Sequence, residues 1–202
     1  MTVIDAGANL GVHSTFIARL VGDGGKVHAF EPSPKNFAKL SDAAKRYRQI
    51  ICHPMALGSE SREVSLYLSD ALNVDHRLYA PPDENRAAVP IRCVALDDII
   101  PSGSVVHFIK ADVQGWELEA MRGAERIIRG SADLKLLCEF WPFGLKSAGS
   151  DPKAFIEYLQ DAGFQIRKVG KSGGLTELRD ADFRIDETVT CNIFATRDKL
   201  AG

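Results

Sequence analysis

The sequence predicts an α/β fold, in which a mostly parallel sheet is covered by helices on both faces. Short apolar segments alternate with amphipathic, helix-like segments along the chain, and this alternation is typical of a sheet built from strand–helix–strand units. Four of the apolar segments end in, or next to, an acid: Asp5, Glu31, Asp112 and Glu139. Ligands of such sheets bind beyond the carboxyl ends of the strands, so these acids are expected to share one site.

Length and composition favour a single domain over residues 1–202 and exclude several classes of protein. The net charge is −2 without a long basic block, so the usual footprint of nucleic-acid binding is missing. No apolar run approaches the roughly 20 residues of a membrane span, and no signal-peptide pattern opens the chain. The four cysteines form no C-x-x-C pair. Reduced, buried thiols and a cytoplasmic location are therefore expected.

The clearest unit occupies the first thirty-three residues. An apolar run ends in Asp5, a turn with Gly7 and Gly11 follows, residues 12–21 have a helical pattern, and a second apolar run over 26–30 precedes Glu31. The glycines permit a sharp turn and a close approach to a ligand, and the helix N-terminus favours an anionic group.

This unit predicts a site for an adenosine-bearing cofactor. Glu31 follows Gly11 by twenty residues, where an acid can accept hydrogen bonds from both ribose hydroxyls. The expected cofactor contacts are Asp5, Gly7, Ala8, Asn9, Gly11, Glu31, Pro32, Ser33, Ala56 and Asp112.

The spacing of the glycines disfavours a dinucleotide. The fingerprint for NAD is G-x-G-x-x-G, but Asn9 and Val12 stand where its second and third glycines would be. A pyrophosphate would lack the glycine that lets the backbone approach it. An NAD-linked oxidoreductase therefore remains only as a rival interpretation.

The middle of the chain is less regular. Its pattern predicts a helix over 35–47, strands over 50–52, 63–68 and 89–94, a loop over 53–58 that holds Ala56, and a short helix over 96–100. Residues 70–90 are rich in Pro, Asn and Asp and predict a long loop. Such loops often carry function, so His76 is a candidate base.

The last ninety residues return to the alternating pattern. It predicts strands over 105–112, 134–140, 164–169 and 187–196, helices over 116–129 and 152–162, a turn over 113–115 and a loop over 141–144. Asp151 is expected to cap the helix that begins at Pro152, and Gly163 to end it.

Taken together, the motifs resemble those of the FkbM-type family of class I S-adenosylmethionine-dependent methyltransferases. The matching stretches are residues 3–11, 30–34, 95–99 and 109–117, and Glu139 matches a later strand-end acid of the family. The resemblance implies a Rossmann-like sheet of seven strands with the last antiparallel, and S-adenosylmethionine as cofactor. It also implies O-methylation of a hydroxyl, often on a sugar or secondary metabolite, so the partner would be a small-molecule or glycan acceptor.

The resemblance also has departures. The family usually has an acid where Gln114 stands, and family members usually carry a segment before the first strand that closes over the cofactor, so an N-terminal lid segment is expected to be missing here. A catalytically impaired cofactor-binding or scaffold protein of the same fold therefore remains an alternative.

Methyl transfer to an alcohol is helped by a base within hydrogen-bond reach. Asp112 is the first candidate for that base, and Glu139 and His76 are the others. The histidines are scattered, so no metal site is expected.

Overall fold

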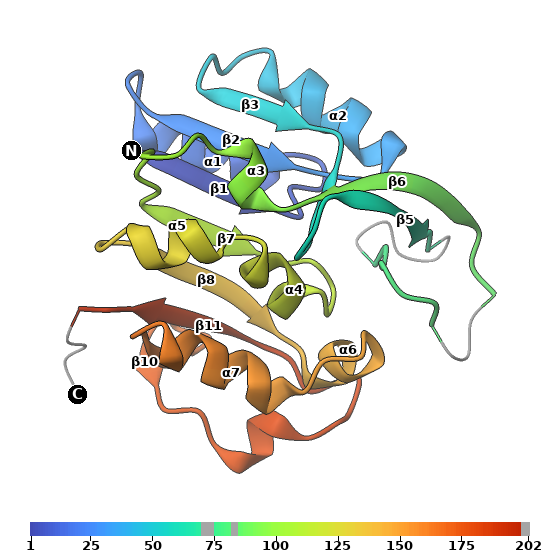
Figure 1. Ribbon diagram of the computed structural model, residues 1–202, viewed down its shortest axis with the longest axis vertical. Helices are drawn as coiled ribbons and strands as arrows, with labels where there is room; N and C mark the ends of the chain where they lie inside the picture. The colour runs from blue at the N-terminus through green and yellow to red at the C-terminus, as the bar shows by residue number, and fades with distance from the viewer. Residues whose placement is uncertain (70–74, 82–84, 199–202) are drawn as a thin grey trace.

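The computed structural model describes residues 1–69, 75–81 and 85–198 (Figure 1). Its main sheet has eight strands in the order β10-β9-β11-β8-β7-β1-β2-β3. In chain order these strands are β1 (Thr2–Ala6), β2 (Lys26–Phe30), β3 (Ile50–His53), β7 (Phe108–Ala111), β8 (Lys135–Phe140), β9 (Gln165–Val169), β10 (Leu175–Thr176) and β11 (Cys191–Thr196).

The pairing confirms a mostly parallel sheet whose last strand is antiparallel. β1, β2, β3, β7 and β8 pair in parallel, whereas β11 runs antiparallel to both β8 and β9. The expected count of seven strands is corrected to eight, because the two-residue β10 adds antiparallel to β9. A tight turn, in which Gly170 N–H donates to the Gly174 carbonyl and Gly173 has φ 83°, brings β10 back. Two residues are too few to produce an alternating sequence pattern.

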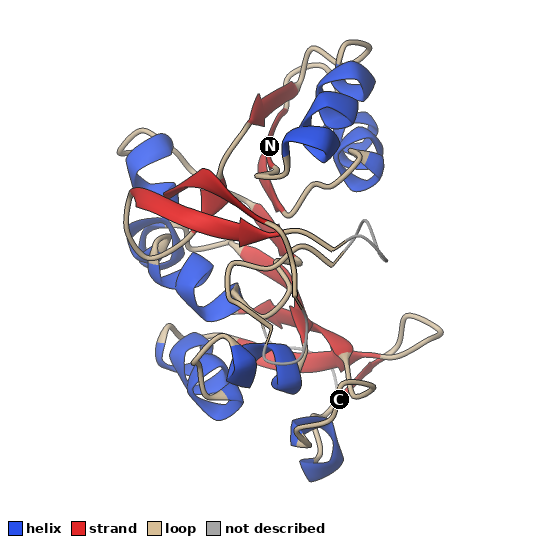
Figure 2. Ribbon diagram, turned by 90° about the vertical axis from the view of Figure 1, so that its right-hand side faces the viewer, coloured by secondary structure: helices blue, strands red, loops and turns tan. Residues whose placement is uncertain are grey.

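Helices cover both faces of the sheet (Figure 2). One face carries α1 (Val12–Val21) and α2 (Pro34–Ala44), and the other carries α3 (Leu96–Ile99), α4 (Glu117–Arg122), α5 (Glu125–Gly130), α6 (Pro142–Ser147) and α7 (Pro152–Asp161). The Asp151 side chain accepts a hydrogen bond from Lys153 N–H, so the expected cap of α7 is confirmed. Strand residues such as Ile4, Ile109 and Leu136 are fully buried, which explains the nearly continuous apolar runs.

The order of the strands reverses beside β1. The chain passes from β1 outward to β2 and β3, and later returns to pair β7 on the other side of β1. The carboxyl ends of β1, β2 and β7 therefore meet where parallel sheets of this kind bind ligands.

A second, three-stranded sheet lies beside the carboxyl edge of the first. Its order is β4-β6-β5, with β4 (Ala56–Leu57), β5 (Arg62–Tyr67) and β6 (Ala88–Val94). β4 corrects the loop expected over 53–58, because Ala56 and Leu57 pair with Cys93 and Val94 from a distant part of the chain. Part of the loop expected over 70–90, at residues 70–74 and 82–84, lies outside the described residues.

Two other expectations about helices are wrong. The helix expected over 116–129 is divided into α4 and α5 at Gly123, where a Cβ atom would lie 1.8 Å from the Gly58 carbonyl oxygen. The loop expected over 141–144 instead begins α6, with Pro142 in its first turn, a position where proline is favoured. The break between α4 and α5 follows from close contact with another segment. The start of α6 follows from the local preference of proline for the first turn of a helix.

Candidate active site

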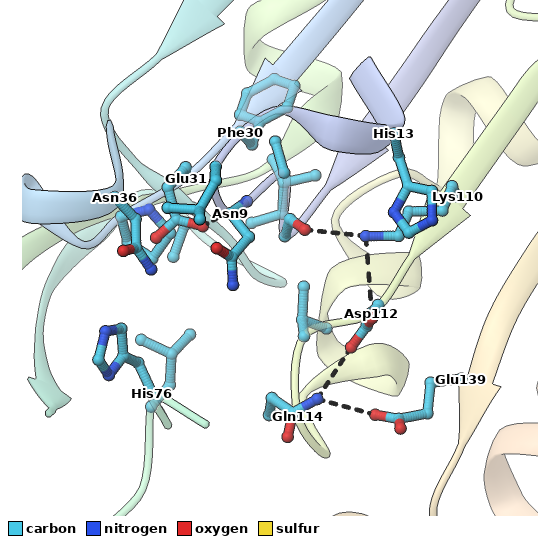
Figure 3. A pocket seen from close by; sticks show the side chains of 18 of the residues that line it. Asn9, His13, Phe30, Glu31, Asn36, His76, Lys110, Asp112, Gln114 and Glu139 are labelled. Carbon is cyan, nitrogen blue, oxygen red and sulfur yellow. Dashed lines mark hydrogen bonds and ion pairs between the residues drawn. The ribbon is translucent and has the colours of Figure 1, made fainter. Parts of the chain in front are cut away.

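A cavity of about 480 Å³ opens at the carboxyl ends of β1, β2, β7 and β8 (Figure 3). Its wall is completed by β4, β5 and the segment after residue 75. The lining residues are Gly7, Ala8, Asn9, Leu10, Val12, His13, Phe30, Glu31, Pro32, Asn36, Ala56, Leu57, Leu66, His76, Leu78, Lys110, Asp112, Val113, Gln114 and Glu139. Most of the residues expected from the sequence to contact a ligand thus lie around one space.

Glu31 is held in place at one end of this cavity. Its Oε2 accepts a hydrogen bond from Asn9 N–H at 2.9 Å, and its Oε1 accepts one from Ser33 N–H at 2.8 Å. The side chain is buried, and this desolvation raises its pKa, against the effect of the two N–H donors and of Lys110. Each carboxylate oxygen keeps a second lone pair, which suits a pair of ribose hydroxyls. Ser33 itself lies outside the lining and acts through its backbone.

The glycine turn after β1 adopts positive φ angles, and neighbouring segments pack closely against it. Gly7 and Gly11 have φ of 75° and 86°, and Asn9 has φ of 50°. A Cβ atom on Gly7 would lie 1.9 Å from the Asp112 carbonyl oxygen, and one on Gly11 would lie 2.9 Å from Leu40 Cδ1. From the sequence, these glycines were expected to permit a sharp turn and a close approach to a ligand. In the structure they allow β7 and α2 to pack against the turn, and Gly11 lies outside the cavity lining.

Asp5 and Lys110 form a buried ion pair beneath the turn. Asp5 is fully buried, accepts a hydrogen bond from Ser14 Oγ at 2.6 Å, and lies 3.3 Å from Lys110 Nζ. Lys110 Nζ also donates to the Gly7 carbonyl at 2.8 Å. Asp5 therefore stands behind the cavity wall and reaches it only through Lys110. Sequence reasoning missed Lys110, although a lysine inside a buried parallel strand needs a partner.

Three side chains converge at the other end of the cavity (Figure 3). Gln114 Nε2 donates to Asp112 Oδ1 at 2.9 Å and to Glu139 Oε2 at 3.0 Å. Glu139 also accepts a hydrogen bond from Thr190 Oγ1 at 3.2 Å. Burial, together with nearby Asp112 and Glu117, raises the pKa of Glu139 to about 8. Sequence reasoning placed Asp112 and Glu139 here but missed the bridging role of Gln114.

A buried acid supports the turn that carries Gln114. Glu117 Oε1 accepts hydrogen bonds from Val113 N–H at 3.0 Å and from Gly115 N–H at 3.3 Å. Glu117 is fully buried, and this desolvation raises its pKa to about 7. On the far side of the turn, a Cβ atom on Gly115 would lie 2.4 Å from the Gly144 backbone. The turn is thus fixed by neighbours on both sides.

His76 lines the cavity but lies away from the two acids. Figure 3 shows it on the side opposite Asp112, Gln114 and Glu139. Its Nδ1 accepts a hydrogen bond from Ser69 N–H at 3.1 Å. The structure therefore brings Asp112 and Glu139 together as alternative bases and separates His76 from them.

The described part of the chain lacks two further features. Within residues 1–69, 75–81 and 85–198, no three His, Cys, Asp or Glu side chains gather as ligands for a metal ion. Over the same ranges, no helix has the length and apolar character needed to cross a membrane.

Comparisons with known proteins agree with this geometry. The family described as methyltransferase FkbM domain matches residues 5–166. No curated protein sequence matches the chain significantly. Among solved structures, an FkbM methyltransferase from Methylobacillus flagellatus KT has a TM-score of 0.59 and 22% identity, and covers 96% of this chain. The match covers only 43% of that longer protein, so this chain spans less than half of its length.

Two further structures share the fold. A putative rRNA methylase from Clostridium thermocellum has a TM-score of 0.57 and 11% identity, with 96% of this chain and 85% of that chain covered. A putative methyltransferase from Streptococcus mutans, solved in complex with SAH, has a TM-score of 0.55 and 9% identity, with 96% of this chain and 87% of that chain covered. At these identities the likenesses establish the fold alone. With the family match over most of its length, the chain belongs to the FkbM methyltransferase family and has the class I methyltransferase fold.

Proposed function

We propose that this protein uses S-adenosylmethionine to methylate a hydroxyl oxygen of a small molecule or glycan, such as a sugar or a secondary metabolite. One observation carries the proposal. A single cavity joins the carboxylate of Glu31, suited to a ribose, to the cluster of Asp112, Gln114 and Glu139, suited to an acceptor hydroxyl.

The lining residues fit a sulfonium cofactor better than a dinucleotide. Among the described residues around the cavity, Lys110 is the sole lysine or arginine, and Asp5 and backbone carbonyls surround its Nζ atom. A pyrophosphate would find little positive charge there. A positively charged sulfur would instead be favoured by the excess of acidic over basic side chains around the cavity. This argues against the rival NAD-linked oxidoreductase.

The chemistry assigned to the protein is orientation and proton removal. S-adenosylmethionine, when bound, supplies an electrophilic methyl group. Asp112 is 43% exposed at the cavity, so its carboxylate can reach a hydroxyl and accept its proton. Removing that proton as the oxygen attacks makes the alcohol a better nucleophile, and holding the oxygen in line supplies much of the remaining rate.

Calorimetry followed by a methyl-transfer screen tests the proposal. We expect binding of S-adenosylmethionine and S-adenosylhomocysteine and none of NAD, and then methyl transfer to a member of a panel of sugar and polyketide hydroxyls. Binding of NAD alone would overturn the assignment. Binding of both sulfur compounds without transfer to any acceptor would favour the scaffold alternative.

A further inference from the structure

Gln114 has a geometry that its neighbours impose. Its φ is 56°, a left-handed conformation that residues other than glycine, asparagine and aspartate adopt rarely. Glu117 holds the backbone on either side of Gln114, and Gly115 packs against Gly144. Unusual conformations that are maintained in this way cluster at functional sites. The result is that the amide of Gln114 lies between two carboxyl groups from different strands.

The amide joins those two groups chemically. A primary amide nitrogen has two hydrogens, and here one points to Asp112 Oδ1 and the other to Glu139 Oε2. Two neighbouring carboxylates repel each other and bind a proton jointly, in steps that belong to the pair. Donors placed between them stabilise the charged forms and keep the two groups at a fixed separation.

We propose that Gln114 is a positioning residue that couples Asp112 and Glu139 into one acid–base pair, which accepts the proton of the methyl acceptor. This inference rests on the proposed function. In the step, the acceptor O–H bond breaks and its proton passes to the pair. The oxygen then bonds to the methyl carbon, and the carbon–sulfur bond breaks with its electron pair left on sulfur.

Other charged or titratable groups surround the pair. Lys110 on β7 has its Nζ 4.0 Å from Asp112 Oδ2, and Asp5 on β1 pairs with the same lysine. Besides burial, Glu117 on α4 raises the pKa of Glu139. Burial is also the main cause that raises the pKa of Cys191 on β11, and Glu139 adds to it. Because burial raises the pKa of Glu139 to about 8, Glu139 can hold a proton near neutral pH.

Three variants separate a bridging role from a merely structural one. Gln114→Met keeps the length of the side chain but removes the donors. Gln114→Glu replaces the donors with a third acid. Gln114→Asn suits a positive φ better than glutamine does, but it is one methylene shorter and cannot reach both carboxyl groups.

The first measurement is the titration of Asp112 and Glu139 by carboxyl NMR in the cofactor-free protein. Loss of donors to a charged form raises its pKa, so in Gln114→Met and Gln114→Asn the pair should bind its proton about tenfold more tightly, which is roughly one pH unit. Gln114→Glu should raise the pKa at which the pair binds its proton further. Thermal unfolding of each variant checks that it is folded.

The second measurement is the pH profile of methyl transfer. In Gln114→Met, the rise of kcat with pH should move to higher pH, and kcat at pH 7 should fall at least tenfold, within the usual range for base catalysis. Binding of S-adenosylhomocysteine should stay within about threefold. If Gln114→Asn is as active as wild type, or if Asp112 and Glu139 titrate in the variants as they do in wild type, the proposed coupling through Gln114 is wrong. A wild-type protein that transfers no methyl group would overturn the proposed function and the catalytic role, while the titration would still decide the coupling.

Discussion

Glu31 shows how individual residues in this site are oriented before a ligand binds. Two backbone N–H groups, from Asn9 and Ser33, bind its two carboxylate oxygens. The first comes from the glycine turn after β1 and the second from the turn after β2. The position of the Glu31 carboxylate therefore depends on both turns, and a cofactor that binds this carboxylate depends on the position of both turns.

Glu31→Ala should weaken binding of S-adenosylhomocysteine by about 1–3 kcal/mol, the usual worth of a hydrogen bond to a charged group. Calorimetry would measure this as a rise in Kd of roughly fivefold to 150-fold. Glu63→Ala, at an exposed position of β5, is the matched control and should bind as wild type does. An unchanged Kd in Glu31→Ala would remove this residue from the cofactor site.

Asp112→Asn should lower turnover by about 10²–10⁴-fold, because an amide cannot accept the hydroxyl proton. Binding of S-adenosylhomocysteine should change little, since the side chain keeps its shape. Single-turnover kinetics and calorimetry would separate the two effects. If binding falls together with turnover, Asp112 is a cofactor ligand, and Glu139 becomes the stronger candidate for the base.

At the scale of elements, the connection from β7 to α4 is built around a buried acid. Glu117 is the first residue of α4 and turns back to accept two N–H groups from the preceding turn. This fixes the position of Gln114 relative to the helix. The cost is a carboxyl group without solvent, whose pKa rises from 4.5 to about 7.

This raised pKa predicts a dependence of stability on pH. The folded protein binds the Glu117 proton more tightly than the unfolded chain does, so the contribution of Glu117 to stability is complete below pH 4.5 and is lost as the pH rises through about 7. Glu117→Gln keeps an oxygen for the two N–H groups and removes the titration. Relative to wild type, its free energy of unfolding should improve by about 3 kcal/mol between acidic and mildly alkaline pH.

Urea denaturation of both proteins at pH 5 and pH 8, taken as test conditions on either side of the transition, would measure this difference. Because Glu117 also raises the pKa of Glu139, the measured difference includes the change in Glu139 titration that the substitution causes. A difference that does not vary with pH would mean that Glu117 stays ionised in the folded state.

The break between α4 and α5 makes a separate prediction. Gly123→Ala would place a methyl group 1.8 Å from the Gly58 carbonyl and should destabilise the protein by roughly 1–3 kcal/mol, as overpacking does. Gly130→Ala, at the end of α5 with nothing within 4 Å of the added carbon, should stabilise by about 0.5–1 kcal/mol. Chemical denaturation would compare the two. Equal effects would show that the contact with Gly58 does not cause the break.

At the scale of the whole molecule, one side of the sheet carries an apolar surface. Val12, Phe16 and Leu20 are spaced by four residues along α1 and are 71%, 58% and 70% exposed. Phe16 and Leu20 border a second cavity of about 470 Å³ that also includes Met1, Phe108 and Leu137. Contiguous exposed apolar patches of this kind are uncommon on monomers.

Replacing both Phe16 and Leu20 by serine should change the free energy of unfolding by less than about 1 kcal/mol, because exposed side chains contribute little to stability. The same change should reduce the fluorescence of a dye that binds apolar surfaces. Leu40→Ser, at a fully buried position of α2, is the contrasting control and should destabilise strongly. A large loss of stability in the double variant would show that these side chains are packed in solution.

The sequence by itself determined the features that depend on local pattern. The boundaries of α1 and β2 agree with the structure to the residue, because an apolar period and flanking glycines mark them directly. The order of acids at strand ends was likewise sufficient to predict a cavity holding Glu31, Asp112 and Glu139, since parallel strands place their carboxyl ends at one edge.

Only the tertiary structure decided what depends on contacts between distant segments. Lys110 reaches the carbonyl of Gly7, β4 pairs with β6, Gly123 accommodates Gly58, and Gln114 bridges acids from two strands. None of these has a periodic signature, because each brings together segments that lie tens of residues apart in the sequence. Buried polar side chains need hydrogen-bond or ionic partners because water cannot reach them. Here the fold supplies such partners for Lys110, Gln114 and Glu139 from distant segments, and these groups form the candidate site.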